Sequence, residues 1–476
     1  MSAASGTRRL LAGALLLAPG CALEACSEPD GSGSGGAAAT GATGTGAAAA
    51  GGVGSSSSAS STGASGGADA GPPQCEPEPI PAVVPEGWVE YTDWSCDCRF
   101  YVPPSKDLLP PPIAWKPCPE APGGIQCQAM VTDWDDSTSP IGSEPKLSHN
   151  PDGSAVLEMV RGVYKQWNMY AIGDADGPMR FAFVQPMHGK SWLGCRFHSE
   201  HLAEGMHVVQ LRGHKTQGNE SKHYGAIGGP IDELRPRLLD REINEDNPWD
   251  NHWECTSKWL FKYTWPMVQT AHPWDMSQQI FVTSSETDPE HDTVGDTVAS
   301  GDALFWSTGT LKRRGINVWD PVAGARLFQR WVGDYTKGAA DLGADGVDLV
   351  WAYGEGKQPD DWTYPIQSIM TAPFTTDPQA LKARRLRSYP GTIGTRPFEV
   401  ACGYAANDGI YDDKMRVMVV RLSDGQAWFL PITEKLWPVH AIGLTCEELF
   451  AVGDVEKKTT IIRIRLDSLG PGVPPD

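Results

Sequence analysis

The stretch from Gly301 to Trp331 reads GDALFWSTGTLKRRGINVWDPVAGARLFQRW and holds three short apolar runs separated by turns rich in glycine and charge. The runs are Ala303–Trp306, Ile316–Trp319 and Ala325–Phe328. Short apolar runs bounded by turn residues predict an antiparallel meander and not a helix. The sequence Asp-Pro-Val-Ala-Gly between the second and third runs predicts a tight hairpin connection.

Turns of the same kind recur along the chain. Aspartates occupy them at intervals of roughly 43 to 57 residues, at Asp275, Asp320, Asp377, Asp424 and Asp467. Asp176 lies about two such periods before Asp275. A repeat of this length, with several short strands per unit, predicts an all-β fold, the β-propeller. We expect seven blades if one unit lies near residues 223–229, and eight if residues 75–147 fold as a further blade.

Two motifs share the phase of the repeat. Asn150-Pro151-Asp152-Gly153-Ser154-Ala155-Val156 resembles the blade opening of TolB-like and WD-type propellers, and the Asp-Gly element recurs at Asp345-Gly346. No strand follows the last apolar run, residues 459–466. Propellers complete such a blade with a strand from the N-terminal part of the chain, which removes an exposed edge. We expect residues 87–94 (GWVEYTDW), which alternate like a strand, to close the ring.

Residues 1–26 have the features of an export signal. Arg8 and Arg9 precede the apolar run Leu10–Ala18, which is too short to cross a membrane as a helix. Leu17-Ala18-Pro19-Gly20-Cys21 then resembles the lipobox of bacterial lipoproteins, whose cysteine receives a diacylglyceryl group. Cys26 is the alternative lipidation site. An ordinary cleaved signal peptide is the alternative for the whole segment.

The rest of the chain divides by composition. Residues 27–74 are nearly all Gly, Ala, Ser and Thr, which bury too little apolar surface to fold, so we expect a disordered tether. We expect a Cys- and Pro-rich segment with the closing strand at 75–147, the blades at 148–470 and a disordered tail at 471–476. This organisation resembles uncharacterised bacterial lipoproteins with a TolB-like or WD-type propeller head.

The cysteines predict disulfides. The chain has 11 of them, and in a secreted protein those beyond the signal are expected to pair with one another and not to bind zinc. The candidate bridges are Cys118–Cys127, Cys402–Cys446 and Cys195–Cys255, with Cys96 and Cys98 joining separate partners. Cys402 and Cys446 lie about one blade period apart, so their bridge would join neighbouring blades.

Two groups of side chains are candidates for a site. Five tryptophans gather in one stretch, at Trp249, Trp253, Trp259, Trp265 and Trp274. Exposed, they would form an aromatic binding surface, but we favour the alternative that they pack between blades. His198, Glu200 and His201 are weak metal candidates, because the two histidines face opposite sides of a strand and a shared metal would need a turn or a helix there. We expect no metal and no cofactor.

No catalytic residue is assigned. Outside the Gly/Ala/Ser/Thr-rich segment 27–74 the sequence has no GxSxG pattern, and it has no HExxH motif. The formal net charge of −20 disfavours nucleic acid as a partner.

We therefore predict an exported, lipid-anchored propeller at the outer membrane or surface of a bacterium, with a periplasmic or secreted protein as the alternative. It would act as a monomer that binds or scaffolds a protein or glycan. The alternative function is a hydrolase or lyase of extracellular polysaccharide. A deep axial pocket with converging carboxylates would favour the enzyme, and a shallow face would favour the binding protein.

Overall fold

A computed structural model describes residues 80, 82, 84–91, 99–112, 114–118, 121, 123–135, 146–149, 155–163, 167–186, 195–214, 221–240, 252–264, 268–284, 294–309, 313–332, 337–355, 366–377, 379–389, 391–393, 397–411, 414–436, 439–456 and 458–475. These residues form strands β1 to β32 and three short 3-10 helices. The helices are η1 (Lys106–Leu108), η2 (Pro431–Lys435) and η3 (Leu466–Ser468). The fold is all-β, as the sequence predicts.

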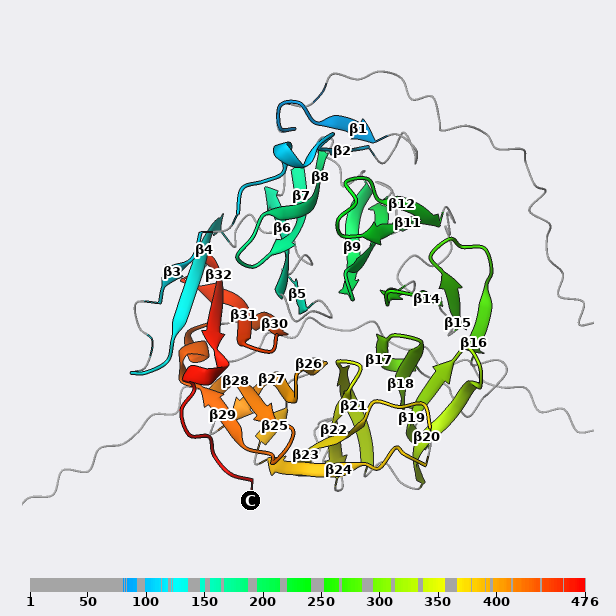
Figure 1. Ribbon diagram of the computed structural model, residues 1–476, viewed down its shortest axis with the longest axis vertical. Coiled ribbons are helices and arrows are strands. Elements are labelled where there is room, and N and C mark those ends of the chain that lie inside the picture. The colour runs from blue at the N-terminus through cyan, green and yellow to red at the C-terminus, as the bar shows by residue number, and fades with distance from the viewer. Residues whose placement is uncertain are drawn as a thin grey trace, which may run out of the picture. The chain divides into compact units, whose positions relative to one another are not determined.

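The strands form seven sheets that are arranged as the blades of a propeller (Figure 1). From the innermost strand outward, blade 1 is β5 (Lys146–His149), β6 (Ala155–Val163), β7 (Trp167–Asp174) and β8 (Met179–Pro186). Blade 2 is β9 (Cys195–Ala203), β10 (Met206–His214), β11 (Ser221–Pro230) and β12 (Arg237–Asp240). Blade 3 is β13 (His252–Cys255), β14 (Trp259–Thr264), β15 (Val268–Pro273) and β16 (Ile280–Ser284).

The next three blades repeat this plan. Blade 4 is β17 (Val294–Ser300), β18 (Ala303–Gly309), β19 (Arg313–Asp320) and β20 (Gly324–Val332). Blade 5 is β21 (Lys337–Ala344), β22 (Asp348–Glu355), β23 (Ile366–Pro373) and β24 (Arg384–Tyr389). In blade 6 the innermost position is shared by β25 (Gly391–Ile393) and β26 (Glu399–Ala401), followed by β27 (Tyr404–Tyr411), β28 (Lys414–Arg421) and β29 (Ala427–Leu430).

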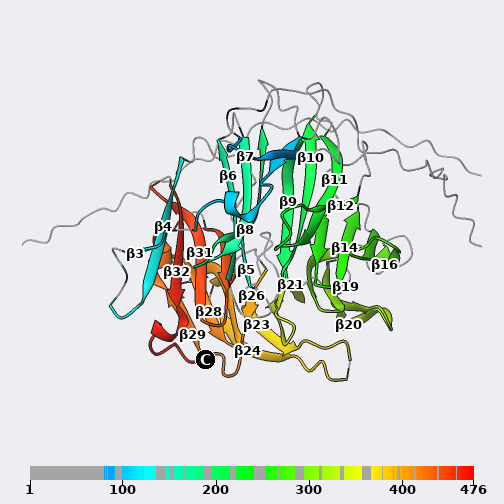
Figure 2. The same ribbon diagram turned by 45° about the horizontal axis from the view of Figure 1, so that its top comes forward.

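Blade 7 combines both ends of the described chain. Its inner strands are β30 (Val439–Leu444), β31 (Glu448–Val455) and β32 (Lys458–Arg465), and the outer ones are β4 (Cys127–Asp135) and β3 (Lys116–Pro117). Strand β4 lies antiparallel beside β32, from Cys127 opposite Ile464 to Asp135 opposite Lys458 (Figure 2). The ring is thus closed by an N-terminal strand, as expected, and has seven blades.

The repeat phase and the meander of blade 4 are confirmed. The three apolar runs of residues 301–331 lie in β18, β19 and β20. The aspartate turns lie between the third and fourth strands of blades 1, 3, 4, 5 and 6, and after the third strand of blade 7. The unit expected near residues 223–229 is blade 2, whose β11 contains those residues and whose turn follows at 231–236.

The identity of the closing strand was predicted wrongly. Residues 89–91 of the expected segment form β1 (Val89–Tyr91), which pairs with β2 (Phe100–Val102) on the outer edge of blade 1. There Tyr91 stacks on Phe100, with ring centroids 4.8 Å apart, and its hydroxyl donates to the carbonyl of Pro236 in blade 2. Tyr91 of this segment therefore extends blade 1 toward blade 2, and Trp88 packs in the cluster shared with blade 7.

The hydrophobic core consists of seven clusters, one between each pair of adjacent blades. Neighbouring residues of one strand serve two of them, because alternate side chains face opposite sides of a sheet. Tyr170 packs toward blade 2, for example, and Ala171 toward blade 7. Each blade is therefore held on both faces by its neighbours.

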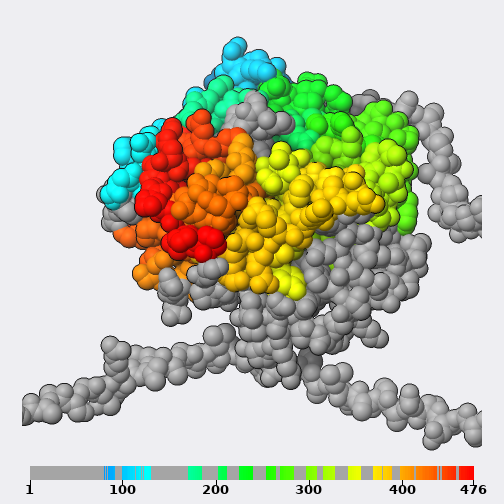
Figure 3. All heavy atoms as spheres, turned by 60° about the horizontal axis from the view of Figure 1, so that its bottom comes forward, coloured from blue at the N-terminus to red at the C-terminus, as the bar shows by residue number. Residues whose placement is uncertain are grey.

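Residues 471–475, expected to be a disordered tail, are ordered. Val473 forms an isolated antiparallel bridge with Ala427 at the start of β29. In Figure 3 the C-terminal residues, in red, lie against the orange residues of blade 6. Composition suggested disorder, but the polar groups of blade 6 bind the backbone of this segment, as described below.

Arg463 on β32 joins the two sides of the closure. Its Nε donates to Gln128 of β4 at 2.5 Å, and its Nη1 lies 2.6 Å from the Asp176 carboxylate in blade 1. Its guanidinium also covers the Trp115 ring, at 4.6 Å from the centroid. One mostly buried cation thus contacts three segments that ring opening would separate.

We expect Arg463→Ala to lower the free energy of unfolding by about 2 kcal/mol, since it removes a charge-assisted pair and a cation–π contact. The matched control is Arg465→Ala on the same strand, because Arg465 is half-exposed and pairs with Asp467 only two residues away. The control should change stability by less than about 0.5 kcal/mol. Urea denaturation measures both, and equal losses would show that Arg463 does not hold the closure.

Candidate functional site

One face of the propeller carries two hairpins of each of blades 1 to 6 and the first hairpin of blade 7. Because strand direction alternates, the turn between the first and second strands and the turn between the third and fourth open on the same side. We call this side the turn face. Its turns are mostly within the described residues, including those at 204–205, 256–258, 301–302 and 345–347.

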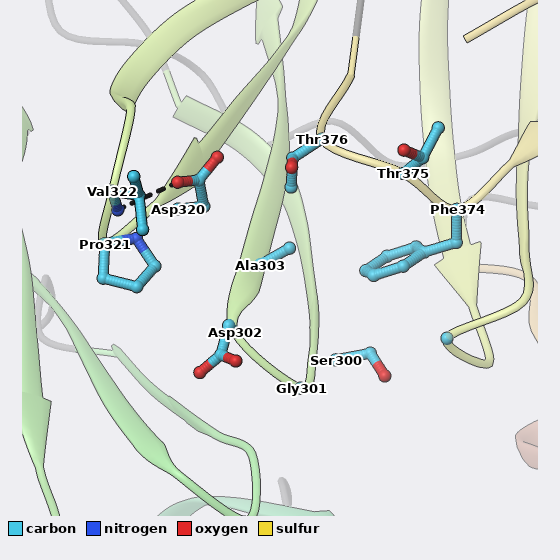
Figure 4. Close-up of a pocket in the computed structure, with 11 residues that line it drawn as sticks. Ser300, Gly301, Asp302, Ala303, Asp320, Pro321, Val322, Phe374, Thr375 and Thr376 are labelled. Carbon is cyan, nitrogen blue, oxygen red and sulfur yellow. Dashed lines mark hydrogen bonds between the residues drawn. The ribbon is translucent and has the colours of Figure 1, made fainter. Parts of the chain in front are cut away.

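A hollow of about 420 Å³ lies on the turn face between blades 4 and 5. It is lined by Ser300, Gly301, Asp302, Ala303, Asp320, Pro321, Val322, Gly346, Phe374, Thr375 and Thr376. Figure 4 shows that the Phe374 ring points into it between Ala303 and Thr375, with the two carboxylates on the blade 4 side. Gly346 has a φ of +83°, and a Cβ there would lie 2.7 Å from the Ser300 hydroxyl, so this close approach of the blades requires glycine.

Both carboxylates of the hollow have lowered pKa values. For Asp302 the main cause is the hydrogen bond from Lys258, whose Nζ lies 2.5 Å away, and the Trp259 indole adds a second. For Asp320 burial acts to raise the pKa, but the backbone N–H groups of Ala323 and Val322 and the guanidinium of Arg326 outweigh it. The two groups are ionised at neutral pH and already paired, which suits them to shaping turns and not to proton transfer.

The rim of the hollow is apolar. Val322 is 94% exposed and Val347, next to the lining residue Gly346, is 69% exposed. Two large aliphatic side chains held in water at the tips of rigid turns favour contact with another molecule. The lining residues include no histidine, cysteine or lysine, and the two carboxylates are already engaged by Lys258, Trp259, Arg326 and backbone N–H groups.

Glu204 fixes the blade 4 side of the hollow from two blades away. Its carboxylate accepts hydrogen bonds from the backbone and hydroxyl of Ser257 in blade 3, at 2.8 and 2.7 Å. It also accepts from Gly301 N at 2.7 Å and from the Ser300 hydroxyl at 2.9 Å in blade 4. Burial acts to raise the pKa of Glu204, but these four bonds outweigh it and lower the pKa. One carboxylate therefore ties three consecutive turns together.

A second group of carboxylates is buried nearer the axis. Asp341 of β21 has a φ of +58° in a bulge, and its backbone N–H donates to Asp296 of β17 at 2.6 Å. Burial and the charges of Asp296 and Asp408 raise the pKa of Asp341 to about 8. Asp341 is 8% exposed, and its carbonyl accepts from Phe398 N of blade 6. At neutral pH this carboxyl is protonated, and the backbone of Asp341 bonds to blade 4 on one side and to blade 6 on the other.

The tryptophans do not form the candidate binding surface as a group. Trp253 is 4% exposed and packs between blades 2 and 3. Trp259 and Trp274 are partly buried, and their indole N–H groups donate to Asp302 and to the carbonyl of Thr256. Trp249 and Trp265 lie outside the described residues. For the three described rings the packing alternative applies.

Residues 198–201 lie in strand β9, so the turn or helix that a shared metal would need is not formed there. The side chains of His198, Glu200 and His201 lie outside the described part of the structure. Among the described residues no group of three His, Cys, Asp or Glu side chains has the geometry of a metal site. Likewise, no helix in the described ranges is long and apolar enough to cross a membrane.

Two disulfides are present where they were expected. Cys118–Cys127 closes the loop between β3 and β4, and Cys402–Cys446 joins the first turns of blades 6 and 7, with Cα atoms 5.1 Å apart. The third candidate bridge, Cys195–Cys255, was predicted wrongly. Cys255 carries a buried thiol that points to the carbonyl of Met206, and burial raises its pKa. Cys21, Cys26, Cys96 and Cys98 lie outside the described residues.

Neither the hollow nor the Asp341 group is evident in the sequence. The hollow is built from four turns of two blades, and although the turns at Asp320, Asp345-Gly346 and Asp377 were predicted, nothing in the sequence indicated that they meet. Asp296 and Asp341 lie one blade period apart, at equivalent inner-strand bulges, and this spacing was the one available signal.

No protein-family model matches the chain, and no curated protein matches it. Solved propellers are similar in fold. The β-propeller domain of the trilobed protease from Pyrococcus furiosus matches with 9% identity and a TM-score of 0.45, over 68% of this chain and 94% of that one. Puromycin hydrolase matches with 13% identity and a TM-score of 0.44, over 75% of this chain and 57% of that one. Putative TolB from Agrobacterium tumefaciens matches with 11% identity and a TM-score of 0.31, over 58% and 94%.

The Asp341 carboxyl predicts a pH dependence of stability. Its pKa is about 8 in the folded chain against 3.8 in its ordinary state, so the unfolded chain loses this proton first. Stability should therefore fall as pH rises from about 4 to about 8. Asp341→Asn keeps the backbone bond to Asp296 and removes the titration. The melting temperature of the variant minus that of wild type should therefore increase from pH 5 to pH 8. The exposed Asp107→Asn is the control, and parallel pH profiles for all three proteins would contradict the prediction.

Proposed function

We propose that this protein is a lipid-anchored, extracytoplasmic propeller that holds a protein or glycan partner on its turn face. The observation that carries the proposal is the open hollow between blades 4 and 5, with its exposed valine rim and its already paired carboxylates. Such a site offers shape and apolar contact, and its carboxylates are already engaged within the protein. It therefore suits recognition better than catalysis.

The location follows from the cysteines. Disulfides persist in oxidising compartments, so the two bridges indicate an extracytoplasmic protein. The lipobox-like sequence ending at Cys21 supports the anchor. A random coil of the length of residues 27–74, as their composition predicts, would span about 40 Å root-mean-square and hold the propeller clear of a membrane surface.

The alternative of a polysaccharide hydrolase or lyase is favoured by one observation. The pKa of Asp341 is raised to about 8, and Asp296 accepts from its backbone, whereas a carboxyl with a raised pKa and a nearby second carboxyl are what glycoside hydrolysis requires. Against it, Asp341 is buried and its backbone is bonded to both neighbouring blades. A polysaccharide-degrading activity that is lost in Asp341→Asn but kept in Asp107→Asn would favour the enzyme.

The anchor is tested by mass spectrometry of the mature protein from a bacterial membrane fraction. We expect an acylated N-terminal cysteine at Cys21. Cys21→Ser should move the protein to the soluble fraction, whereas Cys26→Ser should leave it in the membrane. An unmodified N-terminus on the membrane-bound protein would contradict the anchor, and the reverse behaviour of the two variants would assign it to Cys26.

Binding at the turn face is tested by placing a charge on the rim. In glycan-array and envelope-extract binding assays, Val322→Asp and Val347→Asp should weaken partner binding at least about tenfold, since each charge must be desolvated in the complex. Ile410→Asp is the control, because Ile410 is 45% exposed but lies at the far end of β27. Equal binding by all three variants would place the partner elsewhere.

A further inference from the structure

Residues 470–475 (GPGVPP) lie along the outer edge of blade 6 as an added strand. Val473 N donates to the carbonyl of Ala427 at 2.7 Å, and Ala427 N donates back to the carbonyl of Val473 at 2.9 Å. Together the two bonds make Val473 and Ala427 one hydrogen-bonded antiparallel pair. We call this segment the tail and the edge that it covers the tail groove.

Side chains of blades 5 and 6 bind the carbonyls of the tail. The Trp428 indole donates to Gly470 O at 3.0 Å, and Gln426 Nε2 donates to Gly472 O at 3.3 Å. The Arg387 guanidinium reaches from β24 to Val473 O at 3.1 Å and to Pro474 O at 3.4 Å. Side-chain contacts to four of the backbone oxygens in residues 470–474 recognise an extended chain whatever its side chains are.

The groove nevertheless selects a composition. A Cβ at Gly472 would lie 2.5 Å from Gln426 Cγ and 2.8 Å from Trp428 Cε2, so this position accepts only glycine. The groove accepts a hydrogen bond from the backbone N–H of Val473. The residues at 471, 474 and 475 are prolines, which have no backbone N–H that binding could leave without an acceptor. A glycine- and proline-rich extended segment fits these requirements, and proline also reduces the entropy lost on binding.

The residues that form the groove are more buried than the tail that occupies it. Arg387 is 6% exposed, donates to Gly425 O of blade 6 and covers the Phe429 ring at 5.7 Å. By contrast Val473 is 50% exposed, and the four proline and valine side chains of the tail are all exposed. The tail therefore loses little apolar burial when it leaves, and its release is governed by a few hydrogen bonds.

We propose that the tail groove is a peptide-binding site for extended Gly-Pro-Gly-Val-Pro-Pro-like segments of a partner protein, and that the tail occupies it as an exchangeable ligand in cis. The chain holds a related stretch at residues 81–86 (PAVVPE). It has Ala82 where the tail has Gly472, so the groove rejects it. The site is separate from the hollow on the turn face.

The test frees the groove without shortening the chain. Gly472→Val should eject the tail by the clash with Gln426 and Trp428. A fluorescently labelled acetyl-GPGVPP-amide should then bind the variant in a polarisation assay at least about tenfold more tightly than wild type, whose own tail competes at a high effective concentration. The same peptide with valine in place of its second glycine should not bind.

Arg387→Ala, added to Gly472→Val, should weaken peptide binding a further tenfold or so, because two charge-assisted contacts are lost. Arg384→Ala is the matched control, since Arg384 lies on the same strand and contacts Leu422 and Ser423 instead of the tail. The proposal is overturned if Gly472→Val keeps the wild-type melting temperature but does not bind the peptide at 1 mM, or if Arg387→Ala has no effect. It is also overturned if wild type is a dimer that Gly472→Val dissociates, because the tail of a second copy is then the occupant.

Discussion

The pairing of β32 with β4 is the interaction on which the rest of the structure depends. Each blade buries both faces against its neighbours, so a ring with an open seam would expose the two clusters on either side of blade 7. The closing strand comes from more than 300 residues away in sequence, which makes its loop closure slow and costly in entropy. The Cys118–Cys127 bridge and Arg463 both lie at this seam. They stabilise β4, the strand that is farthest in sequence from its pairing partner.

The turn face is rigid because neighbouring turns are bonded to one another. Glu204 joins blades 2, 3 and 4, Asp345 accepts from Cys402 N across blades 5 and 6, and Cys402–Cys446 continues to blade 7. Several carboxylates of this face accept hydrogen bonds from backbone N–H groups. These bonds stabilise the ionised form, which explains why the pKa values of Glu204 and Asp320 are lowered. The hollow inherits this rigidity, so a partner would meet a preformed surface and lose little entropy in ordering it.

Features formed by residues close together in sequence could be predicted from the sequence, and features formed by distant residues could not. Hairpins are local, so the runs at 303–306, 316–319 and 325–328 predicted β18 to β20, and their repetition predicted seven blades. The closing strand is not local. Residues 87–94 alternate as well as β4 does, and only the tertiary pairing of Tyr91 with Phe100 decides between them. The hollow and the Asp341 group combine turns and bulges from different blades, and a bulge at a φ of +58° leaves no pattern in the residue types.

Ring closure and tail binding both add an extended segment to the outer edge of a blade. They differ in the number of backbone hydrogen bonds and in the apolar surface that is buried. At β32 the added strand forms a ladder and contributes Cys127 and Ala129 to a core cluster, so it does not exchange. At β29 the added segment has one pair of backbone bonds and exposed side chains. Open outer edges attract further strands, and this chain covers those of blades 1, 6 and 7 with its own segments. The cover that contributes least to the core is the one on blade 6, and that edge is therefore where a partner can take its place.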